Sequence, residues 1–150
     1  MNKVEIVERL LSLIEAGDRA SAQKLLSEDF TFSGPVPEPI GGPEWLGMHE
    51  KLHVAFPDWA FNMSDLRVDG DLVRGTAMIT GTHSGELDLS VMGLPSVPAT
   101  GKRIKLPRDE SELMVEGGKV KYFKTNPNPE AGVTGILKQL GVAVPDRPMA

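Results

Sequence analysis

The sequence contains no cysteine, which excludes disulfide bonds, a thiol nucleophile and any metal site built from thiolates. It also lacks long apolar runs, because no stretch approaches the roughly 20 apolar residues that a membrane-spanning helix needs. Near the N-terminus, Lys3, Glu5 and Glu8 interrupt the apolar core that a signal peptide would require. These absences favour a cytoplasmic protein that does not enter a membrane.

Positive charge is also scarce. The chain carries 16 Lys and Arg residues against 21 Asp and Glu residues, which gives a formal net charge of −5. Recognition of a phosphate backbone needs a basic patch or stripe, and here the basic residues are spread along the sequence. We therefore expect no nucleic-acid partner.

Length and composition suit a single domain over residues 1–150 with one core, since 40% of the residues are hydrophobic and 25% are charged. Apolar residues at helical spacing predict helices over 2–16, 19–26, 43–56 and 131–140. Apolar and β-branched runs predict strands over 30–32, 60–68, 72–84, 101–116 and 119–125. Tight-turn residues at 69–71 and 117–118 predict antiparallel pairing. This order predicts an α+β domain whose curved, mostly antiparallel sheet is closed by helices and encloses a pocket.

Five short phrases fall at predicted strand or helix boundaries. They are Phe56-Pro57-Asp58-Trp59, Gly81-Thr82-His83-Ser84-Gly85-Glu86, Ala99-Thr100-Gly101-Lys102, Gly117-Gly118-Lys119-Val120 and Gln139-Leu140-Gly141. In this order and spacing they resemble the SnoaL-like polyketide cyclases, a branch of the cone-shaped nuclear transport factor 2-like fold. The resemblance covers roughly residues 32–142.

The resemblance implies a cone in which the N-terminal helices wrap the sheet around a central apolar pocket. Proteins of that family bind a polycyclic ester and close a ring by an aldol step that uses no metal and no organic cofactor. An aspartate late in the last strand is their general base, and a histidine on the preceding strand assists. The corresponding positions here are Thr125 and Ser111, and neither side chain can accept a proton unaided.

The segment 108–112 offers carboxylates that can take the place of the missing base. Alternation along a strand puts Asp109 on the same face as Ser111, and Glu112 on the opposite face. Pro107 leaves the register open, because a proline cannot donate to the ladder and commonly marks a bulge. The candidate base is therefore Asp109 or Glu112, and the alternative is a solvated strand with ion pairs to Lys121 or Lys124.

The sequence His49-Glu50-Lys51-Leu52-His53 matches the pattern of zinc peptidases, in which two histidines one helical turn apart bind the metal. No third protein ligand follows it, and Trp45 and Leu52 give the same helix an apolar stripe that packing explains. We therefore expect no metal site, although either histidine can still line the pocket.

The sequence thus predicts a protein that acts on a small hydrophobic ligand, polyketide-like or polycyclic, by cofactor-free acid–base chemistry such as cyclisation or isomerisation. The alternative is a ligand-binding module of the same fold that has lost its base. A zinc hydrolase is a third hypothesis. We expect a homodimer formed through the outer face of the sheet. The residues predicted to line the pocket are Trp45, His49, His53, Met63, His83, Ser111, Phe123 and Thr125.

Overall fold

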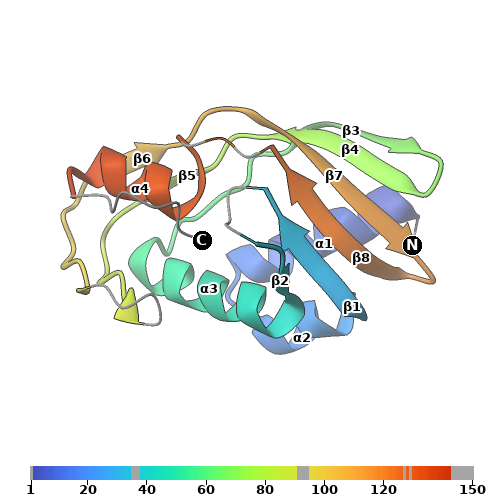
Figure 1. The fold of residues 1–150 in the computed structure, drawn as a ribbon, viewed down its shortest axis with the longest axis horizontal. Helices are drawn as coiled ribbons and strands as arrows, with labels where there is room; N and C mark the ends of the chain where they lie inside the picture. The colour runs from blue at the N-terminus through green and yellow to red at the C-terminus, as the bar shows by residue number, and fades with distance from the viewer. Residues whose placement is uncertain (1, 35–37, 91–94, 127, 129, 143–150) are drawn as a thin grey trace.

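The computed structural model describes residues 2–34, 38–90, 95–126, 128 and 130–142. Three helices and two strands come first, a run of six strands follows, and a last helix closes the described chain (Figure 1). The helices are α1 (Lys3–Glu15), α2 (Arg19–Lys24), α3 (Gly42–Ala55) and α4 (Gly132–Leu140). The strands are β1 (Leu26–Ser33), β2 (Ile40–Gly41), β3 (Ser64–Asp69), β4 (Leu72–Ala77), β5 (Thr80–Thr82), β6 (Arg103–Lys105), β7 (Asp109–Glu116) and β8 (Lys119–Thr125). The expected α+β class is confirmed.

The main sheet has the strand order β2-β1-β8-β7-β4-β3. The pairs β3–β4 and β7–β8 are antiparallel, as the turn residues predict. The pairs β4–β7 and β1–β2 are also antiparallel, and β1 pairs parallel with β8. Strands β5 and β6 form a separate small antiparallel sheet. The described part of the chain contains no helix with both the length and the apolarity needed to cross a bilayer.

The strands expected over 72–84 and 101–116 are each broken in two, which corrects the prediction. The breaks face each other, because the Leu106 amide donates to the Ile79 carbonyl at 2.8 Å just before Pro107. Pro107 has no N–H with which to continue the ladder. The amide of Met78 instead donates to the carbonyl of Phe61 at 2.9 Å. The sheet therefore changes direction at this point.

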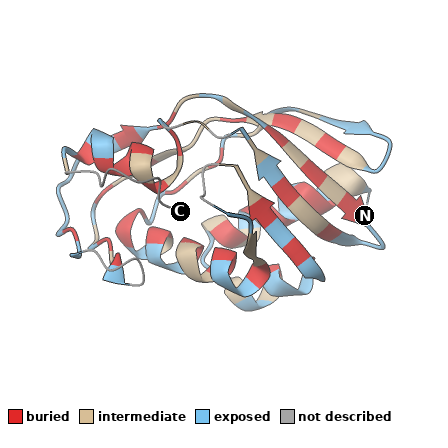
Figure 2. Ribbon diagram, viewed as in Figure 1, coloured by how far each residue is buried: buried red, intermediate tan, exposed pale blue. Residues whose placement is uncertain are grey.

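The break also settles the register that Pro107 left open. Before it, Ile104 and Leu106 are buried; after it, the buried residues of β7 are Ser111, Leu113 and Val115. The inward face thus passes from even to odd residues across Pro107, and Figure 2 shows the resulting alternation along β7. Asp109 consequently lies on the inner face and Glu112 on the outer face.

The helices cover the inner face with their apolar sides. A capping box between Asn2 and Glu5 starts α1, which buries one apolar stripe consisting of Ile6, Val7, Leu10, Leu11 and Ile14. Helix α3 buries Trp45, Leu46, His49 and Leu52. Helix α4 ends at Gly141, whose φ of 77° is the left-handed conformation of a C-terminal cap. One continuous core joins α1, α3, α4 and the sheet.

Two helix glycines provide a test of this packing. At Gly135 in α4 an added Cβ would overlap the backbone carbonyl of Glu130, whereas at Gly47 in α3 its nearest neighbour would be Arg19 Nη1 at 3.9 Å. We expect Gly47→Ala to raise the free energy of unfolding by about 0.5–1 kcal/mol, as alanine does inside an open helix. Gly135→Ala should lower it by about 1–3 kcal/mol through overpacking.

Urea unfolding of both variants, followed by circular dichroism, checks the pair. Equal stabilisation by the two substitutions would contradict the close approach of α4 to residue 130.

Candidate active site

A small apolar cavity of about 80 Å³ lies between α3, the inner face of the sheet and the start of α4. Five aromatic side chains line it, namely Phe32, Trp45, Trp59, Phe61 and Phe123. The two sides of the sheet break also contribute, through Ala77 and Ile79 on one strand and Leu106 and Pro107 on the other. Three polar side chains reach this apolar lining: His49, Asp109 and Thr125.

Asp109 is the first residue of β7 and lies opposite Ala77 in the register. Burial raises the pKa of its carboxyl above the ordinary value of 3.8, and a hydrogen bond with the Asn128 side chain partly opposes the shift. A carboxylate in apolar surroundings becomes a stronger base for the same reason, because its charged form is poorly solvated. Asp109 therefore combines access to the cavity with a pKa that moves toward the range of a general base.

His49 lies among aromatic rings. Its ring centroid is 5.0 Å from that of Trp45, 5.6 Å from that of Trp59 and 5.6 Å from that of Phe61. The residue is only 8% exposed, and burial lowers the pKa of His49 from 6.5 to about 3. The imidazole is thus neutral at physiological pH, and one of its nitrogens carries a proton that it can donate in a hydrogen bond.

Ser111 and Thr125 lie directly opposite each other on β7 and β8. Thr125 lines the cavity, as does its strand neighbour Phe123. Ser111 is 2% exposed, and its Oγ has no hydrogen-bond partner among the residues that the structure describes. The two positions where the resemblance implies a histidine and an aspartate therefore face each other, and neither supplies a proton acceptor. Asp109 lies two residues from Ser111 on the same face of β7.

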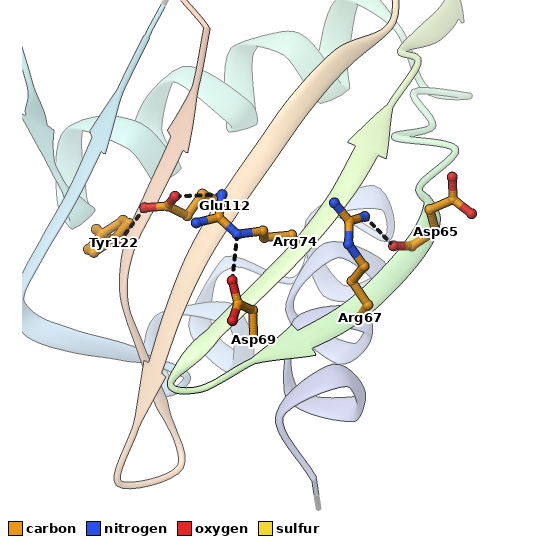
Figure 3. Close-up of polar contacts among 6 residues, drawn as sticks. All are labelled: Asp65, Arg67, Asp69, Arg74, Glu112 and Tyr122. Carbon is orange, nitrogen blue, oxygen red and sulfur yellow. Dashed lines mark hydrogen bonds and ion pairs between the residues drawn. The ribbon is translucent and has the colours of Figure 1, made fainter.

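Glu112 is placed outside the cavity, on the outer face of the sheet. Figure 3 shows its carboxylate between Tyr122 and Arg74, which also contacts Asp69. Arg74 Nη1 lies 2.9 Å from Glu112 Oε1, and the hydroxyl of Tyr122 donates to Glu112 Oε2. Burial and the neighbouring carboxylate raise the pKa of Tyr122 to about 12. The outer-face ion pair thus forms with Arg74, and not with the lysines that the sequence suggested.

Four residues predicted for the pocket are not among those that line the cavity: Ser111, described above, and three residues that lie elsewhere. His83 is fully buried, hydrogen-bonds Thr100 through Nδ1 at 2.9 Å and packs on Phe56. Met63 lies beside Gly75. His53 packs against Gly17, where an added Cβ would come within 2.8 Å of its Nε2, and lines a second pocket to which His49 also contributes.

The sequence also missed the contribution of α4. Ala131, Gly132, Val133 and Ile136 line the cavity, although they lie at least six residues beyond the last residue of β8. The periodicity identified this helix, but no local pattern indicates that its first turn closes the site. As for metals, the described residues contain no group of three or more His, Asp or Glu side chains placed to hold an ion.

The burial of His49 predicts a pH dependence. In the unfolded chain its pKa returns to about 6.5, so below that pH the unfolded state binds a proton that the folded state does not accept until about pH 3. The stability associated with neutral His49 is therefore present above about pH 6.5 and is lost as the pH falls toward about 3. We expect His49→Gln to lose less free energy of unfolding than the wild type between about pH 7 and pH 5. Urea unfolding at both pH values measures this difference, and an equal loss in the two proteins would contradict the desolvated position of the ring.

Comparison with known proteins agrees with this architecture. The family model for SnoaL-like polyketide cyclases matches residues 4–125. Among solved structures, IdmH from Streptomyces antibioticus, provisionally described as a polyketide cyclase, is similar with a TM-score of 0.69 and 24% identity, over 94% of this chain and 100% of IdmH. AclR from Streptomyces galilaeus, provisionally described as a hydroxylase, gives a TM-score of 0.70 and 21% identity, over 91% of this chain and 93% of AclR.

A protein from Jannaschia sp. CCS1, provisionally described as a SnoaL-like polyketide cyclase, gives a TM-score of 0.70 and 18% identity, over 94% of this chain and 92% of that one. No curated protein matches the sequence. The family match spans most of the chain and includes four of the five phrases, whereas the fifth, Gln139-Leu140-Gly141, lies beyond the matched residues. The chain belongs to the SnoaL-like polyketide cyclase family.

Proposed function

We propose that this protein acts on a small hydrophobic carbonyl compound by cofactor-free acid–base chemistry, with Asp109 as the general base. The observation that carries the proposal is the position of Asp109, a carboxyl with a raised pKa in the lining of an otherwise apolar cavity. Perturbed carboxyl groups in such cavities are candidates for proton transfer. The other candidate, Glu112, is neutralised by Arg74 on the opposite face.

In the proposed reaction, the Asp109 carboxylate removes a proton from the carbon next to the substrate carbonyl. The electron pair of the broken C–H bond moves into the enolate, and the proton remains on Asp109. Neutral His49 donates a hydrogen bond to the oxygen on which negative charge develops, a role that a neutral imidazole can fill. The exclusion of water by the aromatic lining strengthens both interactions.

The enolate can then follow either of two courses. If its carbon attacks a second carbonyl of the same molecule, a new C–C bond closes a ring, and Asp109 returns its proton to the resulting alkoxide. If the substrate has a C=C bond conjugated with the enolate, Asp109 returns the proton to the far carbon of that bond, and the product is an isomer whose double bond has moved. In both courses Asp109 ends the cycle ionised.

A second candidate function is ligand binding without catalysis. It is supported by Thr125 and Ser111, which occupy the two positions where the resemblance implies the base and its assisting histidine. In this case the cavity retains its apolar lining and its ligand, and Asp109 serves only as a hydrogen-bonding group. Only the catalytic candidate removes a proton from its ligand, so a measurement of proton removal separates the two candidates.

Exchange of deuterium into enolisable ketones provides this test without knowledge of the product. We expect the protein in D₂O to accelerate exchange at the carbon next to the carbonyl of tetralone and similar ketones, measured by proton NMR. Asp109→Asn should reduce the rate by about 10²–10⁴-fold, the usual effect of removing a general base. Glu112→Gln, which changes a carboxylate outside the cavity, is the matched control and should retain most of the rate.

Binding of these ketones without exchange would favour the non-catalytic candidate. A similar loss of rate in both variants would contradict the assignment of Asp109.

We also propose that the chain forms a homodimer through the outer face of the sheet. This face carries a half-buried patch in which Leu72 lies opposite Met114, and Met114 opposite Tyr122, beside the Arg74–Glu112 ion pair. An apolar patch with a polar rim is typical of an interface with a second copy of the chain. Light scattering at micromolar concentration should give about twice the 16.2 kDa chain mass, and a monomer alone would reject the proposal.

A further inference from the structure

Asn128 lies in the segment between β8 and α4, and its side chain forms a hydrogen bond with the carboxyl group of Asp109. The main chain at Asn128 also reaches the wall of the cavity. Its carbonyl accepts from the amide of Ala131 at 3.0 Å, and Ala131 is one of the lining residues. Asn128 therefore connects the candidate base to the segment that closes the cavity.

The turn around Asn128 fixes which way its side-chain amide points. The amide of Glu130 donates to Asn128 Oδ1 at 2.9 Å, the arrangement in which an asparagine side chain bonds the backbone two residues on. A second turn bond runs from the Asn128 amide to the carbonyl of Asn126 at 2.9 Å. An asparagine side chain ends in one oxygen acceptor and one NH₂ donor. Since the oxygen binds Glu130, the NH₂ group is the part that remains for Asp109.

This donor suits the charged form of Asp109. An ionised carboxylate accepts hydrogen bonds and donates none, so the NH₂ group of Asn128 stabilises the ionised state. Burial raises the pKa of Asp109, and the bond with Asn128 acts in the opposite direction. Asn128 thus limits the rise of the pKa while the carboxylate stays in the lining of the cavity.

We infer that Asn128 is a positioning residue for the proposed reaction: its NH₂ group holds one oxygen of the Asp109 carboxylate and leaves the other oxygen to take the proton from the substrate. This inference rests on the proposed function, in which Asp109 is the general base. A base that is held in one orientation reacts faster than one that rotates freely, because the geometry of proton transfer is set in advance. The turn at Asn128 therefore orients the base as well as leading the chain into α4.

Asn128→Asp separates this chemical role from a structural one. The substitution keeps an oxygen that can accept from the amide of Glu130, so the turn can still form. It replaces the NH₂ donor with a second carboxylate oxygen beside Asp109. The Glu130 amide favours ionisation of the new carboxylate, and two neighbouring carboxylates do not both ionise easily. Asp109 should therefore keep its proton to a higher pH than in the wild type.

Asn126→Asp is the matched control. It makes the same chemical change two residues away, at an exposed position. The main-chain carbonyl that accepts from the Asn128 amide is retained. Because solvent screens an exposed charge, this variant should have little effect on Asp109.

The first measurement follows the carboxyl carbon of Asp109 by ¹³C NMR as the pH is changed, in protein labelled with ¹³C at its aspartates. The signal is assigned by its absence in Asp109→Asn. We expect Asn128→Asp to raise the titration midpoint of Asp109 by about one pH unit or more. Asn126→Asp should leave it within about 0.3 pH unit. Circular dichroism confirms that each variant is folded.

The second measurement is the pH dependence of deuterium exchange into the same ketones. The rate depends on the ionised fraction of the base, so its midpoint should rise in Asn128→Asp as the ¹³C midpoint does. Above the new midpoint, the rate should stay about fivefold or more below the wild-type plateau, because the carboxylate is no longer held. A purely structural role would lower the rate at every pH and leave the midpoint in place.

The inference is wrong if Asn128→Asp leaves the ¹³C midpoint of Asp109 within about 0.3 pH unit of the wild type, or if Asn126→Asp raises it equally. It is also wrong if Asn128→Asp reaches the wild-type plateau rate. Failure of the proposed function is a separate result. If the wild type exchanges no deuterium, Asp109 is not the base of such a reaction, and the ¹³C titration still decides whether Asn128 holds its carboxylate.

Discussion

The structure of the site depends on the interruption of the sheet at Pro107. A proline at this point cannot donate a ladder hydrogen bond, and the chain passes from β6 to β7 with a change of the inward face. Opposite it, β4 ends and β5 begins, and the bond from Leu106 to Ile79 joins the two breaks. This change of face places Asp109 in the cavity lining. With unbroken alternation from Ile104, the carboxylate of Glu112 would have faced inward and Asp109 outward.

Desolvation by the aromatic lining shifts the pKa values of both ionisable groups of the cavity, and the two shifts have opposite directions. It raises the pKa of Asp109 and lowers that of His49, because in each case the charged form loses solvation. A carboxyl group with a raised pKa and an imidazole with a lowered pKa therefore arise from one physical cause. In the described part of the chain, the buried indole nitrogens of Trp45 and Trp59 have no hydrogen-bond partner. Such unsatisfied buried groups lower stability, and sites that bind ligands commonly carry such a cost.

Sequence patterns predicted the elements better than the site. Helical spacing located all four described helices; α1, α3 and α4 each bury several apolar residues, whereas the short α2 buries only Ala22. The strand breaks were missed, since continuous apolar runs do not reveal where the hydrogen-bonding partner changes. The two histidines of α3 show the same limit. They share a helix face by spacing, yet His49 lines the cavity that contains Asp109, whereas the ring of His53 packs against Gly17. Which residue faces a cavity depends on distant segments such as α4, and not on the local pattern.

The position of Asp109 has a consequence for how a substrate lies in the cavity. Ser111 and Thr125, the pair that the resemblance assigns to catalysis, mark one level of the sheet. Asp109 lies two residues along β7 from that level, and two residues of a strand span about 6.8 Å. The displacement runs toward Pro107 and the first turn of α4, whose residues line the cavity. If Asp109 is the base, the reacting carbon must lie closer to Pro107 and α4 than a base at Thr125 would require. The first turn of α4 then becomes part of the wall that selects the substrate.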